Sequence, residues 1–325
     1  MWKRTLSVAT AVLVGAGAFS SQVMAQAASY PDRPIHFVLP YGPGGTVDPT
    51  TRIIAAGVSE VFGKPTVVEN KSGAGGRVGT THVINSKSDG YTVLVHTNKL
   101  PMEPCLMPNL SYNFLTKMKP VMALTMTPFI VVVHPSVPAK NLDELVKHLK
   151  ANPGKLNYGA SGIGSSGQMR GEQFKAQNDV DIAYIPYKDG GSTLKGLVSN
   201  EVQVSFDTLP GSIGYIRDGR LKLLGVGTEK PFFLVPDAPT MVGQGYANLA
   251  PQWVAAYVPI GVPDAVVKKL AAAMGKALKT KKVQDSYKKL GFETIGTGPI
   301  ETLKTFAVEQ QMWCETIKKA GISIK

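Results

Sequence analysis

The sequence has few of the residues that build metal centres and disulfide-dense folds. Only two cysteines, Cys105 and Cys314, occur among 325 residues, whereas small secreted frameworks need several disulfides. Nothing in the sequence shows whether these two cysteines meet, so a disulfide between them stays an open question. The five histidines have no metal-binding spacing such as H-E-x-x-H and no accompanying cysteine pair. The sequence therefore predicts no structural metal.

The chain also lacks a hydrophobic run long enough to span a bilayer. Its uncharged N-terminal segment, Leu6 to Phe19, follows the basic residues Lys3 and Arg4 and precedes the small-residue sequence Val23-Met24-Ala25. This succession is typical of a signal peptide that is cleaved. We therefore predict a signal peptide over residues 1–25, export, and a soluble mature chain.

The formal net charge is +12, but the basic residues are not arranged for nucleic acid. No run of arginines interleaves with aromatic residues, and the lysines are scattered in the pattern of solvated helix faces. An exported protein seldom meets nucleic acid, so we expect none as a partner. The excess of positive charge indicates either a bias towards anionic solutes or a contribution to solubility.

Strand-like segments alternate with helical segments along the chain, which is the pattern of a largely parallel sheet with helices on its faces. Ile35 to Leu39 reads as a strand, and Asp48-Pro49 opens a helix that ends at Gly63. Thr66 to Glu69 begins a second unit of the same kind. Phe129 to Val133 is an apolar, β-branched run of the type buried in parallel sheets.

Glycine loops follow three of the predicted strands. In open α/β sheets, ligands bind beyond the carboxyl ends of the strands, and the helix N-termini there attract anions. Glycine lets the backbone approach a ligand closely. The three loops and the acidic end of a fourth strand, Asp207, therefore indicate an anion site. The loops are Tyr41-Gly42-Pro43-Gly44-Gly45, Gly73-Ala74-Gly75-Gly76 and Gly162-Ile163-Gly164-Ser165-Ser166-Gly167.

The residue spacing of this chain does not match the common sequence motifs of enzymes. The first loop lacks the Gly-Lys-Ser/Thr of a phosphate-binding P-loop, and the second misses the dinucleotide-binding fingerprint. No G-x-S-x-G nucleophile motif is present, and the S-x-x-K at Ser192 to Lys195 has no accompanying K-T-G. Asp207 has no acid or histidine next to it in sequence, so we interpret it as a ligand acceptor or helix cap in preference to a general base. We predict that the protein is not an enzyme.

A series of short segments, taken in their order along the chain, resembles one known family over essentially the whole mature length. The family is that of the tripartite tricarboxylate transporter receptors, the Bug family of bacterial solute-binding proteins. The matching segments are Tyr30-Pro31-Asp32-Arg33-Pro34-Ile35, Pro40-Tyr41-Gly42-Pro43-Gly44-Gly45-Thr46-Val47-Asp48, Val67-Val68-Glu69-Asn70 with Gly73-Ala74-Gly75-Gly76, Asp89-Gly90-Tyr91-Thr92, His134-Pro135-Ser136, Pro153-Gly154-Lys155-Leu156-Asn157-Tyr158, Ile185-Pro186-Tyr187-Lys188 and Phe206-Asp207-Thr208-Leu209-Pro210.

The resemblance implies a two-lobed, type II periplasmic binding protein of the Venus-flytrap kind, with no cofactor. We expect lobe 1 to comprise residues 28–127 and 251–325, and lobe 2 to comprise residues 128–250. In such receptors the first two glycine loops hold one ligand carboxylate, and residues of the second lobe contact the rest of the ligand. The first role carries over to Gly44, Gly45, Thr46, Asp48, Gly75 and Gly76, and the second to Gly164, Ser165, Ser166 and Asp207. We also expect Tyr41, in the first loop, to contact the ligand.

Two departures from the family pattern bear on specificity. Arg77 stands where relatives usually have Asn, and Lys99 stands where they often have a small residue. Arginine and lysine can bind carboxylates through charge-assisted hydrogen bonds. Both residues therefore predict a second anionic group on the ligand, or alternatively they point to solvent. The first alternative favours a dicarboxylate, aliphatic or aromatic.

The sequence thus predicts a monomeric periplasmic receptor that delivers a small carboxylate to integral membrane transporter subunits. A ligand-sensing module that signals to a membrane sensor kinase is the alternative. The two functions would share the same ligand site, so only the partner distinguishes them. The identity of the carboxylate stays open.

Overall fold

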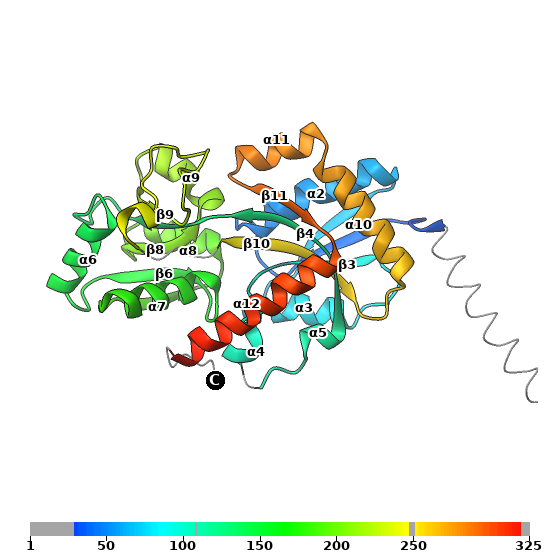
Figure 1. The fold of residues 1–325 in the computed structure, drawn as a ribbon, viewed down its shortest axis with the longest axis horizontal. Helices are drawn as coiled ribbons and strands as arrows, with labels where there is room; N and C mark the ends of the chain where they lie inside the picture. The colour runs from blue at the N-terminus through cyan, green and yellow to red at the C-terminus, as the bar shows by residue number, and fades with distance from the viewer. Residues whose placement is uncertain (1–28, 108, 247–250, 320–325) are drawn as a thin grey trace, which may run out of the picture.

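The computed structural model describes residues 29–107, 109–246 and 251–319. The predicted signal peptide lies outside these ranges. Within them the chain forms two α/β lobes, each built on one mixed sheet with helices on its faces (Figure 1). None of the helices in these ranges is long and apolar enough to cross a membrane.

The first sheet has six strands in the order β11-β4-β10-β3-β1-β2. They are β1 (Ile35–Leu39), β2 (Thr66–Asn70), β3 (Thr92–Thr97), β4 (Met118–Thr127), β10 (Gln252–Pro259) and β11 (Glu293–Thr297). The helices of this lobe are α2 (Val47–Phe62), α3 (Arg77–Ile84), α4 (Glu103–Leu106), α5 (Phe114–Lys117), α10 (Asp264–Leu278), α11 (Lys281–Lys289) and α12 (Pro299–Lys319), and the 3-10 turn η1 covers Ala74–Gly76.

The second sheet has five strands in the order β7-β6-β8-β5-β9. They are β5 (Phe129–Val133), β6 (Asn157–Ser161), β7 (Ala183–Tyr187), β8 (Val204–Thr208) and β9 (Lys222–Val226). The helices are α6 (Leu142–Ala151), α7 (Ser166–Asn178), α8 (Gly190–Val198) and α9 (Leu209–Arg217), and a 3-10 turn, η2, covers Val242–Gln244.

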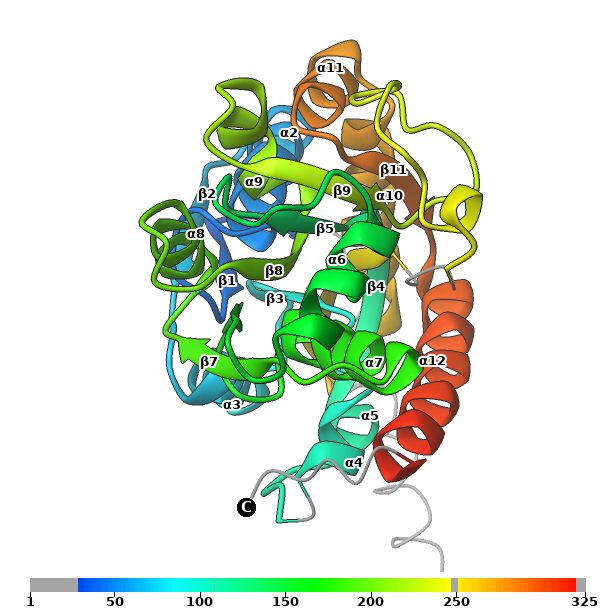
Figure 2. The same ribbon diagram turned by 90° about the vertical axis from the view of Figure 1, so that its left-hand side faces the viewer.

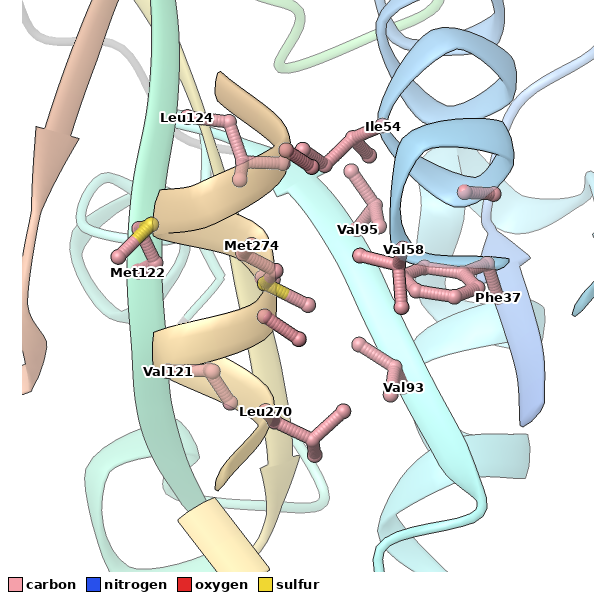
Figure 3. Close-up of a cluster of buried hydrophobic side chains, with 14 of the residues drawn as sticks. Phe37, Ile54, Val58, Val93, Val95, Val121, Met122, Leu124, Leu270 and Met274 are labelled. Carbon is pink, nitrogen blue, oxygen red and sulfur yellow. The ribbon is translucent and has the colours of Figure 1, made fainter. Parts of the chain in front are cut away.

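Both faces of the first sheet are covered by apolar clusters, and β1 contributes residues to each of them. Successive side chains of a strand point to opposite faces. Phe37 and Leu39 accordingly join the core beneath α2 and α10, whereas Val38 joins the cluster on the other face. Figure 3 shows the first core, in which Phe37 and Val93 of the sheet face Val58 of α2, while Met274 of α10 lies beside the same cluster.

Parallel pairing of β1 with β2 and β3 brings three loops to one edge of the first sheet. Leu39 pairs with Asn70, and Val38 pairs with Leu94. Because parallel strands end at the same edge, the loops after Leu39, Asn70 and Thr97 lie together there. The two N-terminal glycine loops are two of these three.

The sheets are mixed, although the sequence pattern predicted mostly parallel ones. In the first sheet β10 runs antiparallel to β3 and β4, and β11 runs antiparallel to β4. In the second, β5 runs antiparallel to both β8 and β9. Strand β5 is buried on both faces, as expected. It follows β4 after a single residue, Pro128, and so enters the second lobe against the direction of the β-α-β units there. Burial can be read from a strand's sequence, but its direction cannot.

Helix α12 links the two lobes. It packs along β4 of the first sheet, and its far end lies beside α7 of the second lobe (Figures 1 and 2). Trp313 and Ile317 of α12, Leu106 of α4 and Met169 of α7 share one buried apolar cluster. Cys105 and Cys314 form a disulfide, which fastens α12 to the region of α4 and settles the pairing that the sequence left open.

Candidate ligand-binding site

A cavity of about 470 Å³ lies between the lobes, and residues of both lobes line it. The volume falls in the range of small-molecule sites, about 300–1,000 Å³. Ten of the thirteen predicted site residues line this cavity. They are Tyr41, Gly44, Gly45, Thr46, Gly75, Gly76, Lys99, Ser165, Ser166 and Asp207.

The first glycine loop brings the lobes into direct contact. Thr46, at the start of α2, forms a 2.7 Å hydroxyl–hydroxyl hydrogen bond with Thr208, at the end of β8. Both side chains are buried. This hydrogen bond therefore joins the two lobes at the wall of the cavity.

The second glycine loop depends on backbone that other residues adopt poorly. Gly75 and Gly76 have φ values of 67° and 103°, in the left-handed region. A Cβ on Gly76 would lie 3.4 Å from Nε2 of His96. The loop therefore rests closely on the buried His96 ring and turns its backbone to the cavity.

His96 is a supporting residue that the sequence did not single out. Its Nδ1 lies 3.0 Å from the Thr97 carbonyl oxygen, which can only accept, so Nδ1 carries the proton. Its Nε2 then accepts from the Tyr41 hydroxyl at 3.3 Å. Burial lowers the pKa of His96 to about 3, and the nearby Lys99 ammonium also lowers it. A neutral imidazole thus lies under the glycine loop at physiological pH.

Lys99 lies at the same end of the cavity. Its ammonium donates to the Gly75 carbonyl oxygen and lies 3.8 Å from Oε1 of Glu103. Only 4% of its side chain is exposed. The structure therefore places this cation in the cavity wall, and does not leave it in solvent.

The second lobe contributes the N-terminus of α7. Ser165 is its N-cap, and the side-chain oxygen accepts from the Gln168 N–H at 3.2 Å. Ser166 is 7% exposed, and its hydroxyl has no hydrogen-bond partner among the residues that the structure describes. A buried hydroxyl at a cavity wall needs a partner, and a bound ligand would supply one.

Asp207 gives the cavity an acidic acceptor. The Ser212 hydroxyl donates to its Oδ2 at 2.8 Å. Burial raises the pKa of the Asp207 carboxyl above its ordinary value, although hydrogen bonds from the Thr208 backbone and Ser212 oppose this shift. When ionised, Asp207 can accept a hydrogen bond from a donor group of the ligand. When protonated, it can donate a hydrogen bond to a ligand carboxylate.

Three of the predicted residues do not line the cavity. Oδ1 of Asp48 accepts hydrogen bonds from the side chains of Arg52 and Asn70 and so stabilises the first turn of α2. The Gly164 N–H donates to the Gln168 side chain at 2.6 Å. Arg77 is exposed, and its Nε donates to the Ala74 carbonyl at 3.0 Å. Of the two basic departures from the family pattern, only Lys99 reaches the cavity.

The start of α8 also belongs to the site, although its residues were not among the predicted ones. Lys188, Asp189, Gly190 and Thr193 all line the cavity. Asp189 caps α8 by accepting from the Ser192 N–H at 2.8 Å, and the Ser192 hydroxyl completes a capping box. In the sequence, Asp189 is followed three residues later by Ser192, just before an apolar run. This spacing resembles a capping box, and it could have predicted the start of α8.

The N-termini of five helices therefore meet at this cavity: α2, α3, α7, α8 and α9. Each presents free N–H groups and the positive end of its dipole. Among the described residues, no group of three or more His, Cys, Asp or Glu side chains could hold a metal ion. The arrangement is suited to holding a small anion between two lobes.

Comparison with known proteins decides the family. A family model described as the tripartite tricarboxylate transporter family receptor matches residues 50–322. The chain belongs to this family. It is therefore a solute-binding receptor of a non-catalytic family, as its sequence motifs predicted.

Individual members resemble the receptor over most of its length. Protein BugT of Bordetella pertussis is 30% identical over 91% of this chain and 92% of its own. The structure of R. palustris Rpa4515 with adipate has a TM-score of 0.86 at 28% identity, and the match covers 91% of this chain and 99% of that one. MatC of Rhodopseudomonas palustris with bound malate has a TM-score of 0.83 at 26% identity and covers 89% and 100%.

Proposed function

We propose that this receptor binds a small carboxylate between its lobes and delivers it to the membrane subunits of a tripartite transporter. The observation that carries the proposal is the convergence of two glycine loops of one lobe and three helix N-termini of the other on one cavity. Two relatives were solved with the dicarboxylates adipate and malate. A dicarboxylate of similar size is therefore the ligand class that we propose.

The proposed contacts divide between the ends of the ligand. One carboxylate lies against the backbone of Gly44, Gly45, Gly75 and Gly76. The other end faces Ser166 and Asp207 of the second lobe. The buried Ser166 hydroxyl, which has no partner among the described residues, supports this orientation.

The lobe boundaries belong to the same proposal. We place lobe 1 at residues 28–127 and 251–325 and lobe 2 at 128–250, with hinges near Met126 to Phe129 and near Trp253. The pairing of β10 and β11 with β4 supports the assignment of the C-terminal segment to lobe 1. Small-angle scattering with and without adipate tests it, since rigid lobes with these limits should fit both curves.

Export is the remaining part of the proposal. Removal of residues 1–25 would release the receptor into the periplasm, where it would meet its membrane partner. Mass spectrometry of the periplasmic fraction tests this directly. A chain that still begins at Met1, or that stays with the membrane, would contradict it.

A thermal-shift panel tests the ligand class. The probes are malate, adipate, citrate and terephthalate, each with the corresponding amide as control. At 100 times its Kd a ligand stabilises the folded state by about 2.7 kcal/mol, which corresponds to a rise of several degrees in melting temperature. At least one carboxylate should give this rise while its amide does not. Absence of any shift across the panel would overturn the proposal.

A further inference from the structure

The pair formed by Lys99 and Glu103 carries an inference that rests on the proposed function and sharpens it. Lys99 follows β3 at the edge where the first two glycine loops lie. Its ammonium donates to the Gly75 carbonyl oxygen, and a Cβ on Gly75 would lie 2.9 Å from the same nitrogen. The cation therefore lies directly against the second glycine loop.

Among the described residues, hydrogen-bond acceptors do not use all the donors of the Lys99 ammonium. The ammonium has three N–H donors, and one of them is used by Gly75. Glu103 Oε1 lies 3.8 Å away, which is too long for a hydrogen bond, and this oxygen has no hydrogen-bond partner among the described residues. A buried, charged donor at a cavity wall is stabilised by a further acceptor. A carboxylate arriving in the cavity would provide one.

Glu103 keeps this cation in place. It is the first residue of α4 and is 1% exposed. Its Oε2 accepts from the Tyr112 hydroxyl at 3.1 Å, so the carboxylate is anchored on the side away from Lys99. Burial lowers the pKa of Lys99 and raises that of Glu103, and the attraction between the two opposes both shifts. An anionic ligand would favour the charged ammonium still more.

We propose that Lys99 binds the same ligand carboxylate as the Gly75-Gly76 loop, with Glu103 as its positioning residue. This differs from the expectation that Lys99 or Arg77 recognises a second carboxylate. Arg77 is exposed outside the cavity, and Lys99 contacts the loop that receives the first carboxylate. The pair makes the site selective for an ionised carboxylate over an amide at this end.

Titration calorimetry with matched ligands measures this selectivity as a difference in affinity. The probes are adipate, hexanoate and hexanamide, which share a six-carbon chain. Since Lys99→Met alone would leave Glu103 buried without its partner, the variants are Lys99→Met/Glu103→Gln and Glu103→Gln. The control is Lys119→Met, which removes a lysine of β4 that pairs with Asp264 and does not line the cavity.

The double variant should lose about tenfold or more of the preference for hexanoate over hexanamide, because a charge-assisted bond is lost. The ratio of adipate to hexanoate affinity should stay as in the wild type. Glu103→Gln should lower the same preference partly, whereas a purely structural loss would weaken all three probes alike. Lys119→Met should match the wild type.

Two results would overturn the inference while leaving the proposed function intact. One is an unchanged preference for hexanoate over hexanamide in the double variant. The other is a loss for adipate that clearly exceeds the loss for hexanoate, which would assign Lys99 to a second carboxylate. If the folded wild-type protein binds neither adipate nor hexanoate, while no other carboxylate stabilises it, the proposed function itself fails.

Discussion

The guanidinium of Arg170 lies 4.2 Å from the centre of the Trp313 ring, although the two residues belong to different lobes. Arg170 also lies 5.0 Å from the ring of Phe129, where the chain enters the second lobe. It is 2% exposed, and burial lowers its pKa to about 9. Helix α7, which carries Arg170, begins at the cavity with Ser165 and Ser166. One helix therefore connects the ligand site to the contact between the lobes.

A double-mutant cycle tests this contact between lobes. Arg170→Met and Trp313→Leu should show a coupling free energy of about 1–2 kcal/mol in unfolding, because desolvated cation–π pairs reach this size. Chemical denaturation of the two single variants and the double variant gives the value. The control cycle uses Arg220 and Tyr215, a more exposed pair within one lobe, and should show a smaller coupling. Additive effects at Arg170 and Trp313 would contradict the prediction.

The disulfide between Cys105 and Cys314 should contribute to stability, because it closes a loop of 209 residues. Constraint of so long a loop in the unfolded chain typically stabilises the folded state by about 2–5 kcal/mol. We expect Cys105→Ala/Cys314→Ala to lower the free energy of unfolding by an amount in this range. Reduced wild-type protein should unfold at the same denaturant concentration as the variant. Equal stability of variant and oxidised wild type would argue against the pairing.

His96 should make the protein less stable in acid. The unfolded chain takes up a proton at His96 near pH 6.5, whereas the folded protein keeps this residue neutral down to about pH 3. Between these values the unfolded state binds more protons, so stability falls as the pH falls, by up to about 1.4 kcal/mol per pH unit. His96→Gln should flatten the dependence measured by denaturation between pH 4 and 7. The exposed His82→Gln should follow the wild-type curve, and the same curve for His96→Gln would refute the prediction.

Gly45→Leu should block the ligand site without disturbing the fold. Gly45 lines the cavity, and a Cβ there would meet nothing within 4 Å. A leucine side chain would project into the cavity and should weaken adipate binding more than tenfold, which is about 1.4 kcal/mol. Gly214→Leu is the matched control, since a Cβ at Gly214 is equally unobstructed and this residue does not line the cavity. Unchanged affinity in the Gly45 variant, with both melting temperatures retained, would place the ligand elsewhere.

Local pattern predicted much of the fold. Apolar runs such as Ile35 to Leu39 became strands, and Asp48-Pro49 with Gly63 marked the limits of α2 to within one residue. Elements with weak local signals were missed. These include β11, which alternates between partly buried and exposed residues at the edge of its sheet, and the short helix α4. Their structure depends on neighbours distant in sequence, here β4 and α12.

The family and the three glycine loops can be recognised without a structure, because these features are encoded by consecutive residues and by the backbone freedom of glycine. Which charged side chains reach the cavity, in contrast, depends on how the folded chain packs. This packing placed Lys99 against Gly75 and left Arg77 exposed, and it brought Cys105 to Cys314 and Arg170 to Trp313. Such neighbours are set by how whole helices and lobes pack, since burial of apolar surface does not depend on separation along the chain. A charge at a loop end gives no local sign of whether packing will bury it against a partner or leave it in water.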